Sequence, residues 1–426
     1  MKLSDIAELN PKRTLKKGTV APFVEMAALP TNAKNITEIT QKTFSGSGSK
    51  FKNGDTLFAR ITPCLENGKT ALITELNDEE IAHGSTEFIV ISPKNISVDM
   101  HYIYYLARLP EFREYARSRM EGTSGRQRVS WQSLAEFEFN FPNEEKRKVI
   151  GEKLSLLDEK ITLNTQTNQT LEQIAQAIFK HWFIDFAPVH AKANALARGE
   201  TIEQAELAAM ACLSGKTEEK ITALKTEDPT AYHQLQQTAA AFPSEFVETE
   251  MGKVPKGWEV KKIDEVIQKI PVGKKYNQKT TVPDGKIPVL DQGKSGIIGF
   301  HNDTAGVKAN IQDPVIVFAN HTCYMRLIHF DFSTIQNVFA FKGKNINIYW
   351  IYLATLGKQK FVEYKGHFPD FLIKQIVVPP KELTEIFGNI VKDSFSKIAL
   401  NLDTNETLAK TRDLLLPRLL SGEIEL

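Results

Sequence analysis

The sequence predicts an α+β fold in which two pseudo-repeated mixed α/β domains are separated by two long helices, packed as an antiparallel coiled coil. Three observations support this prediction. One segment occurs twice, a heptad pattern runs through both copies, and short β-rich runs precede each copy. The length of 426 residues also exceeds that of one ordinary domain, so more than one domain is expected.

The repeat is recognised by landmarks that keep their order along the chain. KITLNTQTNQTL at 160–171 returns as KIALNLDTNETL at 397–408, an offset of 237 residues, and the same offset aligns Pro142 with Pro379 and Gly151 with Gly388. YLARL at 105–109 matches YLATL at 352–356, and LFA at 57–59 matches VFA at 317–319. The order is therefore domain, helix, domain, helix.

Both copies of the repeated segment carry apolar residues at alternating spacings of four and three, which is the pattern of helices that pack along one another. Asn164 and Asn168 interrupt the first seam, and Asn401 and Asn405 interrupt the second. A buried Asn weakens packing but fixes register, because a slip leaves its amide unpaired. We therefore expect these four residues to set the register between the two helices. The alternative is that each seam packs on its own domain.

The landmarks divide the chain into five segments. The first mixed domain spans 1–142 and the first long helix 143–186, and the second mixed domain spans 251–379 and the second long helix 380–426. Short apolar runs such as 56–61 and 315–319 predict strands, and 101–119 and 347–363 predict helices between them. Residues 187–250 are rich in Ala, Glu, Gln and Lys, have no counterpart after the second helix, and predict a partly helical connector.

The charge of the chain is clustered although its net value is only +1. Residues 108–128 carry six Arg against three Glu, 251–294 carry ten Lys against five acids, and 342–374 carry six Lys against two acids. Such clusters fit a nucleic-acid binder, although solvated faces are the commoner explanation of charge alone. Three separated cysteines, no signal peptide and no apolar run long enough for a bilayer predict a cytoplasmic protein outside the membrane.

The sequence carries none of the common motifs of catalysis. GKT at 68–70 and GKS at 293–295 resemble the end of a phosphate-binding loop, but Pro63 and Pro288 stand where that loop needs glycine. The Pro-Pro pair at 379–380 is followed by Lys381, unlike the Pro-Pro-(Tyr/Phe) loop of amino-methyltransferases. His321, Cys323 and His329 lack the spacing of a metal site. We therefore expect no catalytic residue, no metal and no cofactor.

Several long phrases closely resemble the specificity subunits of type I restriction–modification systems. They are KNGDTLFARITPCLENGKTALI at 52–73, EGTSGRQRVSWQSL at 121–134, WFIDFAPV at 182–189, FPSEFVETEMGKVPKGWEV at 242–260 and the terminal LLLPRLLSGEIEL. The resemblance covers nearly the whole chain, apart from part of 190–240. It implies that each mixed domain is a target recognition domain that reads one half of an asymmetric split site in double-stranded DNA. It also implies that the long helices set the gap and dock two methyltransferase subunits, and that restriction subunits complete the complex.

The residues expected to contact DNA lie at matching landmarks in the two domains. Arg, Lys, Asn and Gln can form bidentate hydrogen bonds with base edges, and glycines beside residues 123–128 let that loop approach a backbone closely. In the first domain we expect contacts from Arg60, Thr62, Asn67, Lys69, Thr123, Ser124, Arg126, Gln127 and Arg128, and in the second from Asn320, His321, Arg326, Lys365 and His367.

Other interpretations stay open at this point. Each candidate residue could instead hold a turn or be a solvated charge, and an ordinary structural histidine is the commoner explanation for His321 and His367. At the level of the whole chain, an adaptor whose domains bind protein would show exposed apolar surface on them. An enzyme with an unrecognised site is the third possibility.

Overall fold

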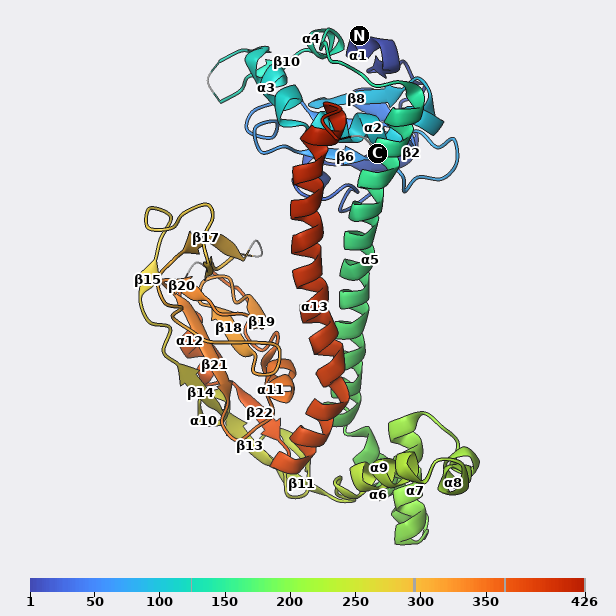
Figure 1. Cartoon of the computed structure of the whole chain (residues 1–426). Helices are drawn as coiled ribbons and strands as arrows, with labels where there is room; N and C mark the ends of the chain where they lie inside the picture. Colours follow the sequence, from blue (N-terminus) through green and yellow to red (C-terminus); the bar gives the residue numbers. More distant parts are fainter. Residues whose placement is uncertain (124, 294–295, 364, 425–426) are drawn as a thin grey trace. The chain divides into compact units, whose positions relative to one another are not determined.

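The computed structural model describes residues 1–123, 125–293, 296–363 and 365–424. Its internal contacts divide the chain into two units: unit 1 comprises Met1–Gln166 with Leu402–Leu426, and unit 2 comprises Thr167–Asn401. Each unit holds one mixed domain and parts of two long helices, α5 (Glu144–Phe183) and α13 (Lys381–Leu420) (Figure 1). The predicted α+β fold with two β-rich domains and two long helices is confirmed.

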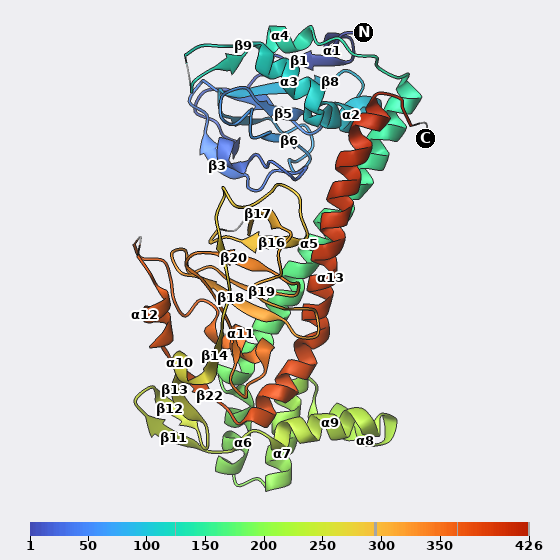
Figure 2. The ribbon, with the colours of Figure 1, turned by 60° about the vertical axis from the view of Figure 1, so that its left-hand side comes forward.

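The mixed domain of unit 1 contains two four-stranded sheets. The first is antiparallel and has the order β1-β8-β5-β6 (Ala7–Leu9, Phe88–Pro93, Thr56–Ala59, Thr70–Leu72). The second has the order β3-β2-β7-β4 (Thr40–Thr43, Val20–Val24, Ala82–Gly84, Ser49–Phe51), with β2 and β7 parallel. Helix α2 (Ile96–Arg108) lies against β5, β6 and β8 (Figure 2). Shorter elements complete the domain: α1 (Leu3–Ile6), η1 (Met26–Ala28), α3 (Pro110–Ser118), β9 (Met120–Glu121), β10 (Arg128–Val129) and α4 (Trp131–Ala135).

The mixed domain of unit 2 repeats this plan. Its first sheet has the order β14-β21-β18-β19 (Ile267–Ile270, Val338–Gly343, Val315–Ala319, Met325–Ile328), and α11 (Ile348–Thr355) packs on β18 and β21. Its second sheet has the order β15-β20-β16-β17 (Lys275–Tyr276, Ser333–Ile335, Ile287–Leu290, Ile297–His301). The remaining elements are β11 (Phe246–Thr249), β12 (Gly252–Pro255), β13 (Glu259–Lys262), α10 (Ile263–Val266), α12 (Phe368–Leu372) and β22 (Gln375–Val378).

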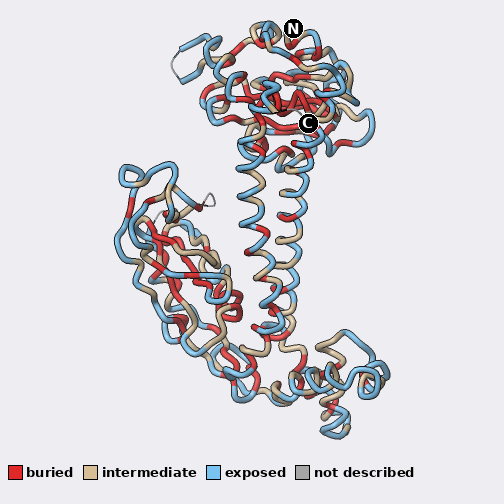
Figure 3. The backbone as a smooth tube through the Cα atoms, viewed as in Figure 1, coloured by how far each residue is buried: buried red, intermediate tan, exposed pale blue. Residues whose placement is uncertain are grey.

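The central strands β5 and β18 are apolar throughout because both of their faces are covered. Side chains alternate across a strand, so neighbouring residues enter different cores. Phe58 belongs to the core that includes α2, whereas Leu57 belongs to the core shared with the second sheet. Phe318 and Val317 divide in the same way in unit 2. The central strands are accordingly buried in both domains (Figure 3).

The long helices run antiparallel within each unit. In unit 1 the beginning of α5 packs on the end of α13, with Ile150 and Leu154 in one core with Leu416 and Leu419. In unit 2 the end of α5 packs on the beginning of α13, where the rings of Phe179 and Phe387 lie 5.7 Å apart. Opposite ends of the two helices therefore meet in each unit, as the chain order predicts.

The connector between α5 and the second mixed domain is mostly helical and lies in unit 2. Its helices are α6 (Ala187–Ala197), α7 (Ile202–Ser214), α8 (Glu218–Glu227) and α9 (Pro229–Ala240). A small core that contains Ala209, Met210, Ile221 and Ala239 holds α7, α8 and α9 together. Among the residues that the structure describes, no helix combines the length and the apolar character needed to cross a membrane.

Gly151 of α5 and Gly388 of α13, which the 237-residue offset aligns, mark the points where each long helix touches its mixed domain. A Cβ at Gly151 would lie 2.8 Å from the backbone nitrogen of Tyr102 on α2. A Cβ at Gly388 would lie 2.2 Å from the carboxamide of Asn347, the N-cap residue of α11. The absence of a side chain therefore permits the close approach of helix and domain at both places.

Gly151→Ala should invert the usual effect of this substitution. Inside a helix, replacing Gly by Ala normally stabilises by about 0.5–1 kcal/mol. At this position the methyl group must displace the backbone of α2, so we expect the free energy of unfolding to fall by about 1–3 kcal/mol in urea denaturation. Lys153→Ala, on an exposed face of the same helix, is the control and should change the value by less than about 0.5 kcal/mol. A more stable Gly151→Ala variant would contradict the close approach.

Candidate nucleic-acid interface

In unit 1 the structure brings together predicted residues that lie far apart in the sequence. Arg60 and Thr62 follow the central strand β5, and residues 126–129, at the second half of the predicted contact loop, lie beside them. The backbone N–H of Val129 donates to the Arg60 carbonyl at 3.0 Å, and the N–H of Thr62 donates to the Gln127 carbonyl at 3.1 Å. The Thr62 hydroxyl accepts from the Gln127 N–H at 3.1 Å. The second half of the loop is thus fixed to the end of β5.

The remaining predicted residues of unit 1 differ in the exposure of their side chains and in the hydrogen bonds that these make. Thr123, Arg126 and Asn67 are exposed. The Arg128 guanidinium is held by the Glu87 carboxylate through bonds of 2.8–3.0 Å, and the Lys69 ammonium donates to the Met26 carbonyl at 2.8 Å. Ser124 lies outside the described residues. Arg126 is therefore the predicted arginine of this loop that extends into solvent.

The predicted residues of unit 2 form a matching arrangement at the end of β18. The backbone N–H of His367 donates to the Asn320 carbonyl at 2.9 Å, and the Asn320 side-chain oxygen accepts from the N–H of Phe368 at 2.8 Å. His321 Nδ1 donates to the Lys365 carbonyl at 2.8 Å. Residues 365–368 are thus fixed to the end of the central strand, as residues 127–129 are in unit 1.

Two of these residues of unit 2 are structural in character. His367 has no exposed surface, and its Nε2 donates to the Glu363 carbonyl at 3.0 Å. Asn320 is also buried, and its side chain makes the bond that holds the following loop.

The other two predicted residues of unit 2 are less buried. Arg326 donates to the Asp291 carbonyl at 2.9 Å, and burial lowers the pKa of its guanidinium. Lys365 is exposed and forms ion pairs of 3.4 Å with Glu363 and Asp370.

A pocket of about 390 Å³ opens beside Arg60 in unit 1. We call it the basic pocket, because four of its lining residues are cations: Lys12, Arg13, Lys50 and Arg60. Arg13 is neutralised by buried Asp55, and burial raises the pKa of that carboxyl group against the opposing effect of Arg13. Arg60 Nε is buried and has no hydrogen-bond partner within the described part of the chain. The pocket therefore keeps a surplus of positive charge and an unused donor.

A pocket of about 570 Å³ opens beside His321 in unit 2. We call it the amide pocket, because five of its lining residues are Asn or Gln: Asn277, Gln278, Gln292, Gln336 and Asn337. Lys275, Tyr276, Ile298, His321 and Ile335 complete the lining. The amide pocket thus offers many paired donors and acceptors and little charge.

The two pockets occupy corresponding places in the two domains. Each lies at the end of the central strand, β5 or β18, and beside the turn that leads into its neighbour, β8 or β21. Each is completed by a segment that follows the edge strand β1 or β14. Of these lining residues, the sequence predictions included Arg60 and His321. The other lining residues lie in segments that the landmarks of the repeat do not align, some on strands such as β4 and β15 and some in turns.

The four register asparagines pair within each unit. In unit 1 Asn164 Nδ2 donates to Asn405 Oδ1 at 2.8 Å, and Asn405 Nδ2 donates to the Ile161 carbonyl at 3.4 Å. In unit 2 Asn401 Nδ2 donates to Asn168 Oδ1 at 2.8 Å, and Asn168 Nδ2 donates to the Ile398 carbonyl at 3.4 Å. The offset of 237 residues converts one set of bonds into the other.

A buried ion pair joins the long helices in unit 1. Asp158 of α5 and Arg412 of α13 are 3% and 2% exposed and form a salt bridge, and the Tyr105 hydroxyl donates to Asp158 at 2.6 Å. Burial and this carboxylate raise the pKa of Tyr105 above its usual range. The positions equivalent to Asp158 and Arg412 in unit 2 hold buried Phe395 and Ala175. The equivalent positions are thus buried in both units, but the ion pair of unit 1 is replaced by apolar side chains in unit 2.

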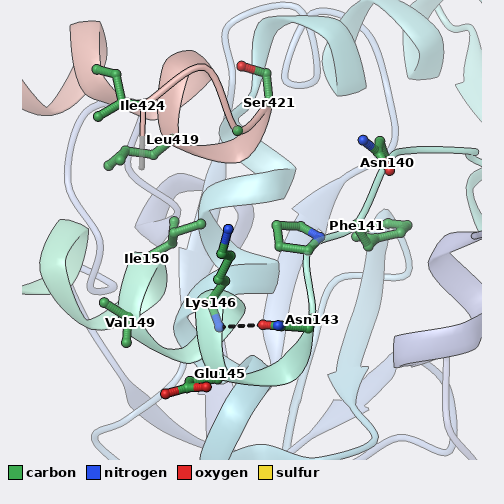
Figure 4. Close-up of a pocket in the computed structure, with 12 residues that line it drawn as sticks. Asn140, Phe141, Asn143, Glu145, Lys146, Val149, Ile150, Leu419, Ser421 and Ile424 are labelled. Carbon is green, nitrogen blue, oxygen red and sulfur yellow. Dashed lines mark hydrogen bonds between the residues drawn. The ribbon is translucent and has the colours of Figure 1, made fainter. Parts of the chain in front are cut away.

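A further pocket of about 520 Å³ lies in unit 1, where α5 begins and α13 ends (Figure 4). Val149 and Ile150 of α5 and Leu419 of α13 supply its apolar lining, with Ile424 beyond the helix end. Asn143 caps α5 by accepting the N–H of Lys146 at 2.9 Å.

Within the described ranges, no group of three His, Cys, Asp or Glu side chains could hold a metal ion.

Comparisons with known proteins all find similarity to type I specificity proteins. Residues 1–173 match the family model of the type I restriction modification DNA specificity domain. The chain is 35% identical over 416 residues to the HindI type I specificity subunit of Haemophilus influenzae, covering 90% of this chain and 89% of that protein. It is 24% identical over 358 residues to the MjaIX specificity subunit of Methanocaldococcus jannaschii, covering 78% and 71%. A crystal structure of the type I S subunit from M. genitalium aligns with a TM-score of 0.49 and 15% identity, over 99% of this chain and 95% of that one.

Arg412→Met should destabilise the chain strongly, because it leaves the Asp158 carboxylate buried without its cation. We expect a loss of about 3–5 kcal/mol in the free energy of unfolding, measured by urea denaturation. Lys410→Met, which removes an exposed cation paired with Glu406 on the same helix, is the matched control and should have little effect. Adding Asp158→Ala to Arg412→Met should recover part of the loss, since no unpaired charge then remains. Equal effects of Arg412→Met and the control would contradict the role of the ion pair.

Proposed function

Because this chain belongs to the specificity subunits of type I restriction–modification enzymes, we propose that it reads a split site in double-stranded DNA, one half with each unit. Its established role is that of the DNA specificity subunit in a complex with partner subunits. The chemistry on DNA therefore belongs to those partners, and this chain selects the sequence. The finer proposal is that the two halves differ and that a nonspecific gap separates them.

The observation that carries this proposal is the correspondence of the basic pocket and the amide pocket. Both lie at the same place in the repeated fold, yet one is lined by cations and the other by carboxamides. Residues that only support the fold would be expected to repeat with the fold. Cations suit guanine edges and phosphates, whereas carboxamides suit adenine edges. Two readers with unlike chemistry predict an asymmetric site.

We choose the proposed contacts by the exposure of each side chain and by the hydrogen bonds that it already makes within the chain. In unit 1 we propose that DNA is faced by Arg60, Asn67 and the exposed loop residues Thr123 and Arg126, joined by Lys12 and Lys50 of the basic pocket. The guanidinium of Arg128 is held by Glu87 and so positions this surface. Thr62 and Lys69 hold neighbouring backbone and so position this surface. In unit 2 we propose contacts from His321, Arg326, Lys365 and the amide pocket. Asn320 and His367 are buried and fix the loop of residues 365–368 instead of touching DNA.

We assign the docking of two methyltransferase subunits to the long helices. Large apolar side chains are exposed on α5 and α13 in both units: Leu156, Leu163, Leu402 and Leu414 in unit 1, and Ile174, Ile390 and Leu400 in unit 2. Leu163 and Leu400 are equivalent under the 237-residue offset, at 56% and 50% exposure. Exposed apolar surface on the long helices of both units, with this one equivalent pair, suits two copies of one partner. The pocket where α5 begins adds apolar area in unit 1 (Figure 4), and restriction subunits would complete the complex.

The proposal is tested by mapping methylated adenines in DNA from cells that express the full complex with and without this chain. We expect methylation that depends on the chain and falls within one sequence of two short unlike halves, separated by unspecified bases. Two readers held at a fixed spacing would give this pattern, because the spacing of the half-sites follows the spacing of the readers. A single contiguous methylated sequence, or methylation that does not depend on the chain, would contradict the proposal.

Arg126→Ala should weaken reading of one half only. Arg126 is exposed on the loop beside Arg60, so its loss should cost about 1–3 kcal/mol of discrimination if it contacts a base edge. The measurement is the binding of the purified complex to duplexes that carry single changes in each half. Arg117→Ala is the matched control, since Arg117 is exposed on α3 of the same domain and pairs with Glu114 at 3.1 Å. Equal loss at both halves would indicate a phosphate contact or a folding defect.

A further inference from the structure

The amide pocket is unusual for the number of its uncommitted carboxamides. The side chains of Gln278, Gln336 and Asn337 are exposed and make no hydrogen bond in the part of the chain that the structure describes. Gln292 uses its oxygen to accept the backbone N–H of His321 at 2.9 Å, which leaves its amide nitrogen as a donor. One small pocket therefore presents several free donors and acceptors side by side.

The backbone that carries these amides is held in place. Gln336 and Asn337 form the turn between β20 and β21, and Asn337 adopts a left-handed conformation with φ of 63°. The Asn337 carbonyl accepts the N–H of Asn320 at 2.9 Å, which ties the turn to the end of the central strand. Across the pocket, Asn277 accepts the N–H of Lys279 at 2.9 Å and so orders its own turn. The amides are thus mounted on a fixed frame.

From this geometry we propose that the amide pocket binds the major-groove edge of an adenine, and that Gln336 makes the bidentate contact. The inference rests on the proposed function and names the base that unit 2 selects at this place. Adenine presents an acceptor at N7 beside a donor at N6, and a carboxamide supplies the complementary donor and acceptor. Gln336 has both groups unused and stands on the turn tied to Asn320.

The lining of the pocket disfavours guanine and cytosine. Guanine presents two acceptors and is read best by cations, and Lys275 is the single cation among the lining residues that the structure describes. Cytosine presents a donor and is read by carboxylates, of which this described lining has none. Arg326, which donates to the Asp291 carbonyl at 2.9 Å, is not among the lining residues of this pocket. Carboxamides are therefore the groups that can decide the base.

The equivalent turn of unit 1 shows that this chemistry is specific to unit 2. There Thr86 and Glu87 precede β8, and the Glu87 carboxylate holds the guanidinium of Arg128. The same position of the repeated fold thus presents an ion pair in one domain and unused amides in the other. A turn that only stabilised the fold would need no such difference.

The test uses the complete complex with Gln336→Ala and Gln336→Glu, and measures binding to duplexes that carry each of the four base pairs at every position of the site. Gln336→Ala should lose its preference for adenine at one position of one half by about ten- to hundredfold. Gln336→Glu should shift that position toward cytosine, because a carboxylate accepts from its amino group. Gln312→Glu is the control, since it adds the same charge at an exposed position of unit 2 outside the pocket.

The possible outcomes are distinct. Loss of discrimination at one adenine of one half, with the other half unchanged, supports the inference. Unchanged base preference at every position in both variants overturns it, as does a uniform loss of binding to all duplexes. These results leave the split-site proposal standing if the wild-type complex still reads two halves. A wild-type complex that binds one contiguous site would instead overturn the proposed function itself.

Discussion

Hydrogen bonds between side-chain amides fix α5 to α13, and the rest of each unit is built on that pairing. Asn164 with Asn405, and Asn401 with Asn168, are joined at 2.8 Å inside seams that are otherwise largely apolar. A slip along either helix would bury a carboxamide against leucine or isoleucine, at a cost of about 1–3 kcal/mol for each unmet group. Apolar residues alone would tolerate several registers. The amides therefore decide which residues of the two helices face one another, and so which surface the mixed domain meets.

The attachment of each mixed domain to the helices uses the same positions with different chemistry. In unit 1 the hydroxyl of Tyr105 donates to Asp158, which Arg412 neutralises. In unit 2 the equivalent Tyr352 packs against Phe395 and donates to Glu172 at 3.3 Å. Burial and that carboxylate raise the pKa of Tyr352, so both tyrosines stay protonated donors. A glycine in each long helix lets the domain approach closely enough for these contacts.

How much could be predicted from the sequence depended on whether a feature repeats or has a period. The two long helices and their asparagines were predictable because a 4-3 pattern and a constant offset are visible in one chain. Arg60 and Asn320 were found as landmarks because they follow a matched strand. The other lining residues of the two pockets were not found, since residues such as Lys12, Lys50 and Gln336 lie in segments that the landmarks of the repeat do not align.

Burial and partners were the other limit of prediction. In the sequence His367 is a polar residue of a basic loop, but in the structure its ring is buried and hydrogen-bonded to the Glu363 carbonyl. The sequence predicts a base contact from Arg128, but its guanidinium is bound by Glu87, which lies far away in the sequence. A single sequence does not reveal which cation meets which carboxylate. Which side chains are exposed and which are held by partners could therefore be learned only from the structure.

The placement of the pockets explains how one scaffold can carry two pockets of unlike chemistry. The central strands β5 and β18 are covered on both faces, so a substitution there disturbs two cores at once. The pockets begin where those strands end, and their exposed residues, such as Lys12 and Gln336, contribute little to the cores. Substitutions of this kind usually change stability by less than about 0.5 kcal/mol. The chemistry of each pocket can therefore change while the strands, the glycines and the paired asparagines continue to hold it in the same place.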